Sequence, residues 1–215
     1  MRLLPQRAAY LVDAGLLLVA DLHLGKAQSF RRLGVPVPQG TTSASLARLD
    51  EALASTGARS IVFLGDLIHS ARSRAPATWA AVARWRDRHA GLTLHLVRGN
   101  HDRHAGDPPC EWRIDCVEEP WPVANAAGLV LAHHPTPVPG AYVLAGHLHP
   151  AASLGGRAHD HLRLACFHFG PAVGVLPAFG SFTGAKVLPR SPADRVYAVH
   201  DAAVVPLPPP RGGRS

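Results

Sequence analysis

The sequence lacks the features of several protein classes. No apolar run approaches the roughly 18 consecutive residues of a membrane-spanning helix, so no membrane association is expected. The three cysteines, Cys110, Cys116 and Cys166, form no CxxC pair, which argues against a zinc ribbon or a disulfide framework and favours a reducing compartment. The apolar stretch at residues 16–20 is short and ends at Asp21, within the first polar cluster described below. We therefore predict a strand of a cytoplasmic protein there and not a cleaved signal region.

Lysine is also scarce, because only Lys26 and Lys186 are present, yet the net charge is +7. The isoelectric point near 10.1 suggests a polyanionic partner. The chain is rich in Ala, Arg, Gly and Pro, a bias that a GC-rich genome also produces. The charge alone therefore leaves a nucleic-acid partner open.

The dominant pattern is an apolar run followed by a polar loop. Runs that are apolar on consecutive residues favour strands covered on both faces. Strands are predicted at residues 8–12, 16–20, 61–64, 92–97, 129–132 and 142–145, and beyond His149 at 161–169, 172–176 and 196–200. The last three have no helix between them, which indicates a second, more antiparallel sheet.

Two helices are predicted between the strands, over residues 42–56 and 76–90. Gly57 and Gly91 are expected to end them, and Pro76 suits the first turn of the second. The residues expected to face the core are Leu46, Leu49 and Leu53 in the first helix and Trp79, Val82 and Trp85 in the second.

The length of 215 residues suits one domain. We assign residues 1–205 to it. Residues 206–215 are rich in Pro, Gly and Arg and are expected to form a disordered tail.

Five short polar clusters each follow an apolar run. Asp, Asn and His side chains are ligands of divalent metal ions, and together the clusters supply enough of them for two ions that share one carboxylate. Such a pair of ions is typical of hydrolases that act on phosphate esters. The clusters are Asp21-Leu22-His23, Gly65-Asp66, Gly99-Asn100-His101-Asp102, His133-His134 and Gly146-His147-Leu148-His149.

Each residue type suits a role. A carboxylate such as Asp66 can bridge two cations, since each oxygen can hold one of them. The imidazoles favour Mn, Fe, Zn or Co over Mg or Ca, and Mn is preferred here. His101 follows Asn100 directly and is expected to stabilise the transferring phosphoryl oxygen or to protonate the departing alkoxide, with Asp102 orienting its ring.

The ordered set DLH, GD, GNHD, H and GHLH over residues 21–149 resembles the calcineurin-like metallophosphoesterase superfamily. The resemblance implies an α/β (α+β) fold, a four-layer αββα sandwich of two mixed β-sheets flanked by helices. His101 matches the catalytic histidine, with Asp102 as its partner. His133 is preferred to His134 as a ligand because it comes first after the apolar run. The resemblance implies a first metal ion held by Asp21, His23, Asp66 and His149, and a second held by Asp66, Asn100, His133 and His147.

A narrower resemblance covers residues 20–26, Phe30-Arg31-Arg32, residues 34–40 and residues 176–184. These segments are similar to the ligase-associated DNA damage response endonuclease (PdeM-like) group. This resemblance implies an endonuclease that acts on DNA in damage repair, with a DNA ligase or helicase as possible partners.

The implied mechanism is phosphodiester hydrolysis by a metal-bridging hydroxide that attacks phosphorus in line, assisted by His101. Lys26 and Arg103 lie closest to the clusters in sequence and are expected to bind substrate phosphates.

Two alternatives remain at this stage. The first is the same chemistry on a small nucleotide or a phosphomonoester, since few aromatic residues lie near the motifs to stack on bases. The second is a catalytically silent scaffold of the same fold. The complete ligand set and the presence of His101 argue against the scaffold.

Overall fold

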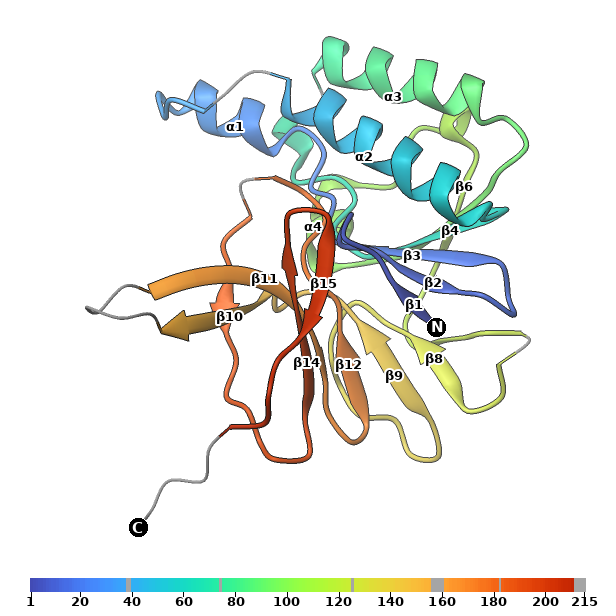
Figure 1. The fold of residues 1–215 in the computed structure, drawn as a ribbon. Coiled ribbons are helices and arrows are strands. Elements are labelled where there is room, and N and C mark those ends of the chain that lie inside the picture. Colours follow the sequence, from blue (N-terminus) through green and yellow to red (C-terminus); the bar gives the residue numbers. More distant parts are fainter. Residues whose placement is uncertain (38–39, 74, 125, 156–160, 182, 211–215) are drawn as a thin grey trace.

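The computed structural model describes residues 1–37, 40–73, 75–124, 126–155, 161–181 and 183–210. It consists of two packed β-sheets, with the helices gathered beyond the first of them (Figure 1). No described helix is long and apolar enough to cross a membrane.

The first sheet is mixed, with the order β1-β2-β3-β4-β5-β6. Its first three strands pair antiparallel, whereas β3 to β6 are parallel. Its strands are β1 (Arg2–Leu3), β2 (Ala9–Leu11), β3 (Leu16–Ala20), β4 (Ser60–Leu64), β5 (Thr93–Val97) and β6 (Ile114–Val117).

The second sheet is also mixed and runs β13-β10-β11-β12-β9-β8-β7, with β14 and β15 added beside β11. Strand β9 lies between β8 and β12 and is parallel to both. Its strands are β7 (Trp121–Pro122), β8 (Leu129–Leu131), β9 (Tyr142–Ala145), β10 (Pro150–Gly155), β11 (His161–Phe169), β12 (Val173–Val175), β13 (Lys186–Val187), β14 (Arg195–His200) and β15 (Ala203–Pro206).

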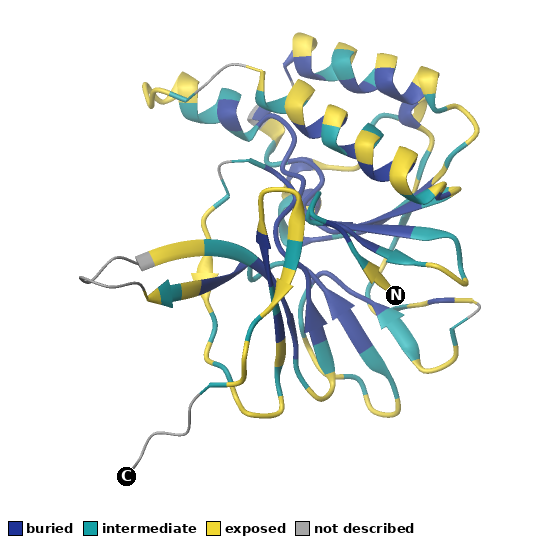
Figure 2. Cartoon of the chain, viewed as in Figure 1, coloured by how far each residue is buried: buried dark blue, intermediate teal, exposed yellow. Residues whose placement is uncertain are grey.

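The central strands are largely buried (Figure 2), and β3 is apolar at every position because its two faces pack against different layers. In β3, Leu17 and Val19 belong to the core shared with the helices, whereas Leu18 and Ala20 belong to the core between the sheets. Alternate residues of a strand point to opposite faces, so a strand buried on both sides must be apolar at every position.

Helices α2 and α3 cover the outer face of the first sheet (Figure 1). Helices α2 and α3 carry the predicted apolar stripes, and Leu49 and Trp85 are almost fully buried. The helices are α1 (Lys26–Arg32), α2 (Thr41–Thr56), α3 (Pro76–Arg88) and α4 (Asn100–Ala105), with short 3₁₀ turns η1 (Ala71–Ser73) and η2 (Cys110–Trp112).

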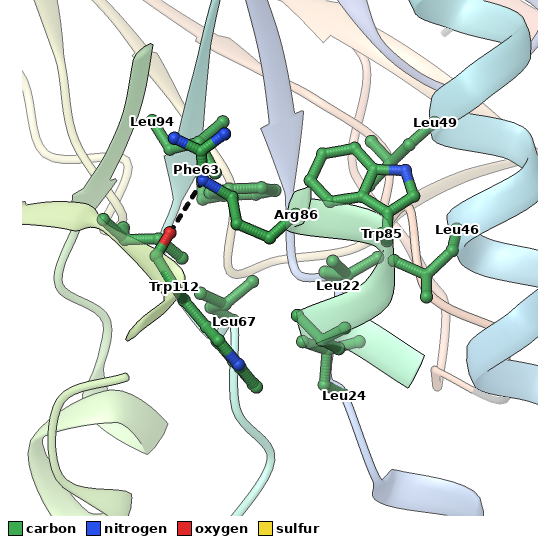
Figure 3. A pocket seen from close by; sticks show the side chains of 12 residues that line it. Leu22, Leu24, Leu46, Leu49, Phe63, Leu67, Trp85, Arg86, Leu94 and Trp112 are labelled. Carbon is green, nitrogen blue, oxygen red and sulfur yellow. Dashed lines mark hydrogen bonds between the residues drawn. The ribbon is translucent and has the colours of Figure 1, made fainter. Parts of the chain in front are cut away.

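The helical side of the core encloses a small apolar cavity of about 20 Å³, shown in Figure 3. The guanidinium of Arg86 lies beside it and is only 4% exposed. Its Nε donates to the carbonyl of Trp112 at 2.9 Å and Nη2 donates to that of Leu92 at 2.9 Å, while Nη1 bonds the carbonyl of His89. The cavity is too small for a substrate, and Arg86 serves to satisfy buried carbonyls.

We expect Arg86→Met to destabilise the fold by about 3 kcal/mol, because one buried and two partly buried carbonyls lose their donor while the alkyl packing is kept. Arg84→Met, at an exposed position of the same helix, should change stability by less than about 0.5 kcal/mol. Urea denaturation measures both. Equal stability of the two variants would contradict this role for Arg86.

The predicted fold of two mixed sheets with flanking helices is confirmed. From Ile114 onward the described residues form only strands and loops, so the described helices lie on one side of the sandwich. The predicted boundary at residue 205 differs slightly from the structure. Strand β15 includes Pro206, and the Leu207 amide donates to the carbonyl of Val196 at 2.8 Å. Residues 211–215 of the predicted tail lie outside the described residues.

Candidate metal centre

The five polar clusters meet at one edge of the two sheets. Asp21, Asp66 and Asn100 follow β3, β4 and β5, which are parallel neighbours, so their carboxyl ends lie together. His133 and His147 follow the parallel pair β8 and β9 of the facing sheet. The strand register thus brings together residues up to 128 positions apart, from Asp21 to His149.

The backbone at these clusters is unusual, because five of the predicted ligands have positive φ. Left-handed backbone is uncommon outside glycine, although Asp, Asn and His tolerate it better than most residues. Each instance costs on the order of 1–3 kcal/mol and is found mainly at functional sites. It also lets residues i and i+2 of a strand-end loop turn toward one point. The φ values are 52° for Asp21, 48° for His23, 50° for Asp66, 70° for His147 and 46° for His149.

A first group of atoms converges around His23. Its Nε2 lies 3.4 Å from Nε2 of His149 and 3.8 Å from Oδ2 of Asp66. Asp21 Oδ1 lies 3.4 Å from His149 Nε2. The other nitrogen of His149 bonds the carbonyl of Gly184 at 2.9 Å, which leaves Nε2 directed at this group.

A second group converges around His133, which is fully buried. Its Nε2 lies 3.0 Å from Asn100 Oδ1, 3.0 Å from His147 Nδ1 and 3.5 Å from Asp66 Oδ1. Its Nδ1 lies 3.1 Å from the carbonyl of Leu64, to which it donates, so that Nε2 carries the free lone pair.

Asp66 lies between the two groups. Its Oδ2 is the oxygen nearer His23, and its Oδ1 is the oxygen nearer His133. The carboxylate therefore offers one oxygen to each side, as a bridging ligand does.

These spacings fit metal ions. Two ligands bound at about 2.1 Å, with angles of about 90–109° at the ion, lie about 3.0–3.4 Å apart. The pairs His23–His149 and His133–His147 fall within this range. The buried atoms Asp21 Oδ1 and His23 Nδ1 have no hydrogen-bond partner within the described protein, and Asp21 Oδ1 is part of the first group. The residues present therefore form clusters able to hold divalent metal ions.

Two glycines allow the close approach of these loops. A Cβ on Gly65 would lie 2.1 Å from Nδ1 of His133, and the φ of Gly65 is +74°. A Cβ on Gly99 would lie 2.4 Å from Oδ1 of Asp66. Any larger residue at either position would displace a predicted ligand.

Three histidines of the site favour the neutral form, which is the metal-binding form of imidazole. Burial lowers the pKa of His23, and nearby Lys26 adds to the effect. Burial also lowers the pKa values of His133 and His147. His149 differs, because its contact with the Asp21 carboxylate, 3.4 Å away, outweighs burial and raises its pKa.

These shifts predict that the metal-free protein loses stability on acidification. Below the ordinary histidine pKa of about 6.5, His23, His133 and His147 are protonated in the unfolded chain but remain neutral in the folded protein. Protonation therefore favours the unfolded state. His69 adds to this effect, since burial lowers its pKa to about 4. We expect these four histidines to outweigh His149, Asp66 and Asp102, whose raised pKa values act in the opposite direction. The melting temperature in chelator should therefore fall between pH 7 and pH 5.5. A constant or rising melting temperature over that window would contradict the shifts.

His101 lies beside the centre, with Nε2 3.9 Å from Asp66 Oδ2. The sequence-based expectation that Asp102 orients its ring differs from the structure. Asp102 accepts the backbone amides of Ile68 at 3.1 Å and Gly99 at 3.0 Å, so it fixes the start of α4. The His101 ring is held instead by His69, whose carbonyl lies 2.7 Å from His101 Nδ1 and whose ring stacks on it at 5.0 Å. A six-residue helix turns Asp102 inward, away from the neighbouring ring.

His134 and Glu119 lie at the edge of the second group. Glu119 Oε1 lies 2.6 Å from His134 Nδ1, and its Oε2 accepts the amides of His133 and His134 at 2.7 and 2.8 Å. His134 thus holds Glu119, while His133 lies in the centre of the ligand group. The geometry favours His133 over His134, although His134 is close enough to His133 and His147 for a shared ion.

The two predicted phosphate-binding residues have different environments. Burial lowers the pKa of Lys26, which lies at the start of α1 within the electrostatic reach of Asp21 and Asp66. Arg103 is paired with Glu118 at 2.5 Å on the surface, and Glu118 also holds Arg98 at 3.1 Å. Lys26 therefore lies close to the centre, whereas the charge of Arg103 is already paired with a carboxylate.

Sequence reasoning missed His69 and Glu119. His69 follows Asp66 by three positions in the same loop, which is a weak signal, and burial lowers its pKa to about 4. Glu119 belongs to none of the clusters and reaches them only through the fold.

A model of the calcineurin-like phosphoesterase family matches residues 15–161, which include every predicted ligand. The chain belongs to the calcineurin-like phosphoesterase family. Members of this family bind divalent metals, in agreement with the clusters described above.

One solved structure supports the same assignment. The phosphoesterase is 43% identical to the nuclease MPE of Pseudomonas putida, with a TM-score of 0.81 over 95% of this chain and 93% of that one. It also matches the phosphoesterase Yfce of E. coli at 15% identity and a TM-score of 0.44, over 88% of this chain and 96% of that one. No curated protein sequence matches the chain significantly.

Proposed function

We propose that this phosphoesterase is a two-metal-dependent phosphodiesterase that acts as a nuclease on DNA. The observation that carries the two-metal proposal is the position of Asp66, with one carboxylate oxygen directed at each ligand group. The nuclease proposal rests on 43% identity to a nuclease over nearly the whole chain and on the net charge of +7.

In this proposal the first ion is held by Asp21, His23, Asp66 and His149, and the second by Asp66, Asn100, His133 and His147. Bound divalent ions would lower the pKa of a water molecule and offset charge on the phosphate. Manganese is the proposed metal, with iron, zinc or cobalt as alternatives, because the ligand set mixes imidazole nitrogen with oxygen.

Side chains of the protein would position the substrate and supply a proton to the leaving group. His101 donates through Nδ1 to the His69 carbonyl, so Nε2 is the atom directed at the reacting phosphate. As the bond from the water oxygen to phosphorus forms and the ester bond breaks, the imidazolium form of His101, which carries a proton on Nε2 as well as on Nδ1, would give the Nε2 proton to the departing alkoxide. Lys26 neutralises charge beside Asp21 and Asp66. Cytoplasmic DNA repair, with a DNA ligase or helicase as partner, is part of the same proposal.

Hydrolysis of bis(p-nitrophenyl) phosphate by metal-stripped protein, with and without added Mn²⁺, tests the chemistry. We expect turnover that depends on Mn²⁺, followed by cleavage of long DNA in preference to nucleotides. Turnover of nucleotides or phosphomonoesters alone would favour the small-molecule alternative. Metal binding without any turnover would favour the scaffold.

A further inference from the structure

A large cavity adjoins the metal centre on the side of His101. It has a volume of about 750 Å³, within the range of about 300–1,000 Å³ that is typical of ligand sites. It lies between α1, η1 and α4 and is lined by Asn100 and His101 of the centre together with Ser29, Arg32, Leu33, His69, Ser70 and His104.

We propose that this cavity holds the nucleotide of the DNA strand that lies next to the scissile phosphate on the His101 side. The proposal rests on the proposed function and names the part of the substrate that this side of the site binds. His101 stands between the metal ligands and the cavity, so a group that leaves past His101 enters the cavity directly.

The chemistry of the lining suits a nucleotide. Arg32 brings a positive charge, Ser29 and Ser70 bring hydroxyls, and none of the described lining side chains is a carboxylate. Hydroxyls and a guanidinium are common partners of phosphate and sugar oxygens. This complementarity to a polyanion agrees with the overall charge of the chain.

Base contacts are available in the same cavity. Leu33 lines the cavity and is 73% exposed, so its apolar side chain is accessible to a ligand. The His104 ring is held by a contact of 2.6 Å from Nδ1 to the Asn100 carbonyl. Apolar side chains and imidazole rings support nucleobases.

Aromatic and imidazole rings form the wall next to the centre. Phe30, His69 and His101 form a stack, with ring centroids 6.3 Å apart for Phe30–His69 and 5.0 Å for His69–His101. These ring contacts connect the lining of the cavity with His101. The cavity on the other side of the centre, of about 300 Å³, is lined by Glu119, whose carboxylate would repel a phosphodiester.

The test compares Leu33→Glu with Leu162→Glu, an exposed leucine of β11 outside the cavity. Both positions are at the surface, so neither variant should unfold. Binding of a fluorescent oligo(dT) strand is measured by anisotropy in chelator, and KM for DNA and turnover of bis(p-nitrophenyl) phosphate are measured with Mn²⁺. We expect Leu33→Glu to raise Kd and KM for DNA by at least about tenfold. Leu162→Glu should match the parent.

A second pair, Arg32→Glu and Arg84→Glu, repeats the comparison at the cationic position. Unchanged DNA binding in both Leu33→Glu and Arg32→Glu would overturn the proposal. Cavity-dependent DNA binding by a protein that hydrolyses no phosphodiester with any metal would overturn the proposed function while supporting the subsite.

Discussion

Replacing Asp66 with asparagine is expected to abolish metal-dependent turnover. In the parent, Oδ2 of Asp66 lies 3.8 Å from His23 Nε2, and Oδ1 lies 3.5 Å from His133 Nε2. Asparagine offers one neutral oxygen in place of these two, so it cannot contribute a ligand to both groups. Turnover at neutral pH should fall by at least about 10⁴-fold, because ordinary water, with a pKa of about 15.7, is ionised far less than metal-activated water with a pKa of about 7. Asp66→Ala should likewise lose metal and activity together.

Metal content by mass spectrometry and hydrolysis of bis(p-nitrophenyl) phosphate measure this prediction. Asp115→Asn is the matched control, since its carboxylate is 78% exposed on β6 and far from the ligand groups. The fold should survive in both variants, because burial raises the pKa of Asp66 and a neutral group at this position is easier to bury. Two bound ions and parental turnover in Asp66→Asn would disprove the bridging role.

The residues that form the metal centre could be predicted from the sequence, because the end of a buried strand is marked by the end of an apolar run. Asp21, Asp66 and Asn100 each follow such a run, and parallel neighbours end at one edge of a sheet. The left-handed backbone that turns His23 and His149 inward is not visible in a pattern, but it explains how alternate residues converge. The set of ligands could therefore be predicted although the backbone conformation of the loops that carry them could not.

Other parts of the site depend on contacts that no spacing reveals. His69 acts through a backbone carbonyl, which every residue type carries, so its identity gave no signal. Arg103 was close in sequence to the clusters, but its charge is taken up by Glu118, fifteen positions away. Helix α1 has too few residues for a periodic pattern, and β13 has only two residues that pair with β10. Tertiary contacts define these elements.

The second large effect is expected for His101→Ala. DNA cleavage should slow by about 10²–10⁴-fold while both metal ions are retained. The His101 side chain is not placed as a ligand, and the bond from its backbone amide to Asp66 Oδ1 at 2.9 Å survives the substitution. Loss of metal together with activity would show that the His101 ring belongs to the ligand set.

Comparing two leaving groups distinguishes proton donation by His101 from electrostatic stabilisation of the phosphoryl oxygens. A sugar alkoxide needs a proton as it departs, whereas p-nitrophenolate is a stable anion and leaves without one. If His101 Nε2 gives that proton, His101→Ala should slow DNA cleavage at least about tenfold more than hydrolysis of bis(p-nitrophenyl) phosphate. His200→Ala, an exposed imidazole at the end of β14, should leave both rates unchanged. Equal losses on the two substrates would show instead that His101 acts on the phosphoryl oxygens, and its neighbour His69 would then serve to hold a charge-stabilising ring.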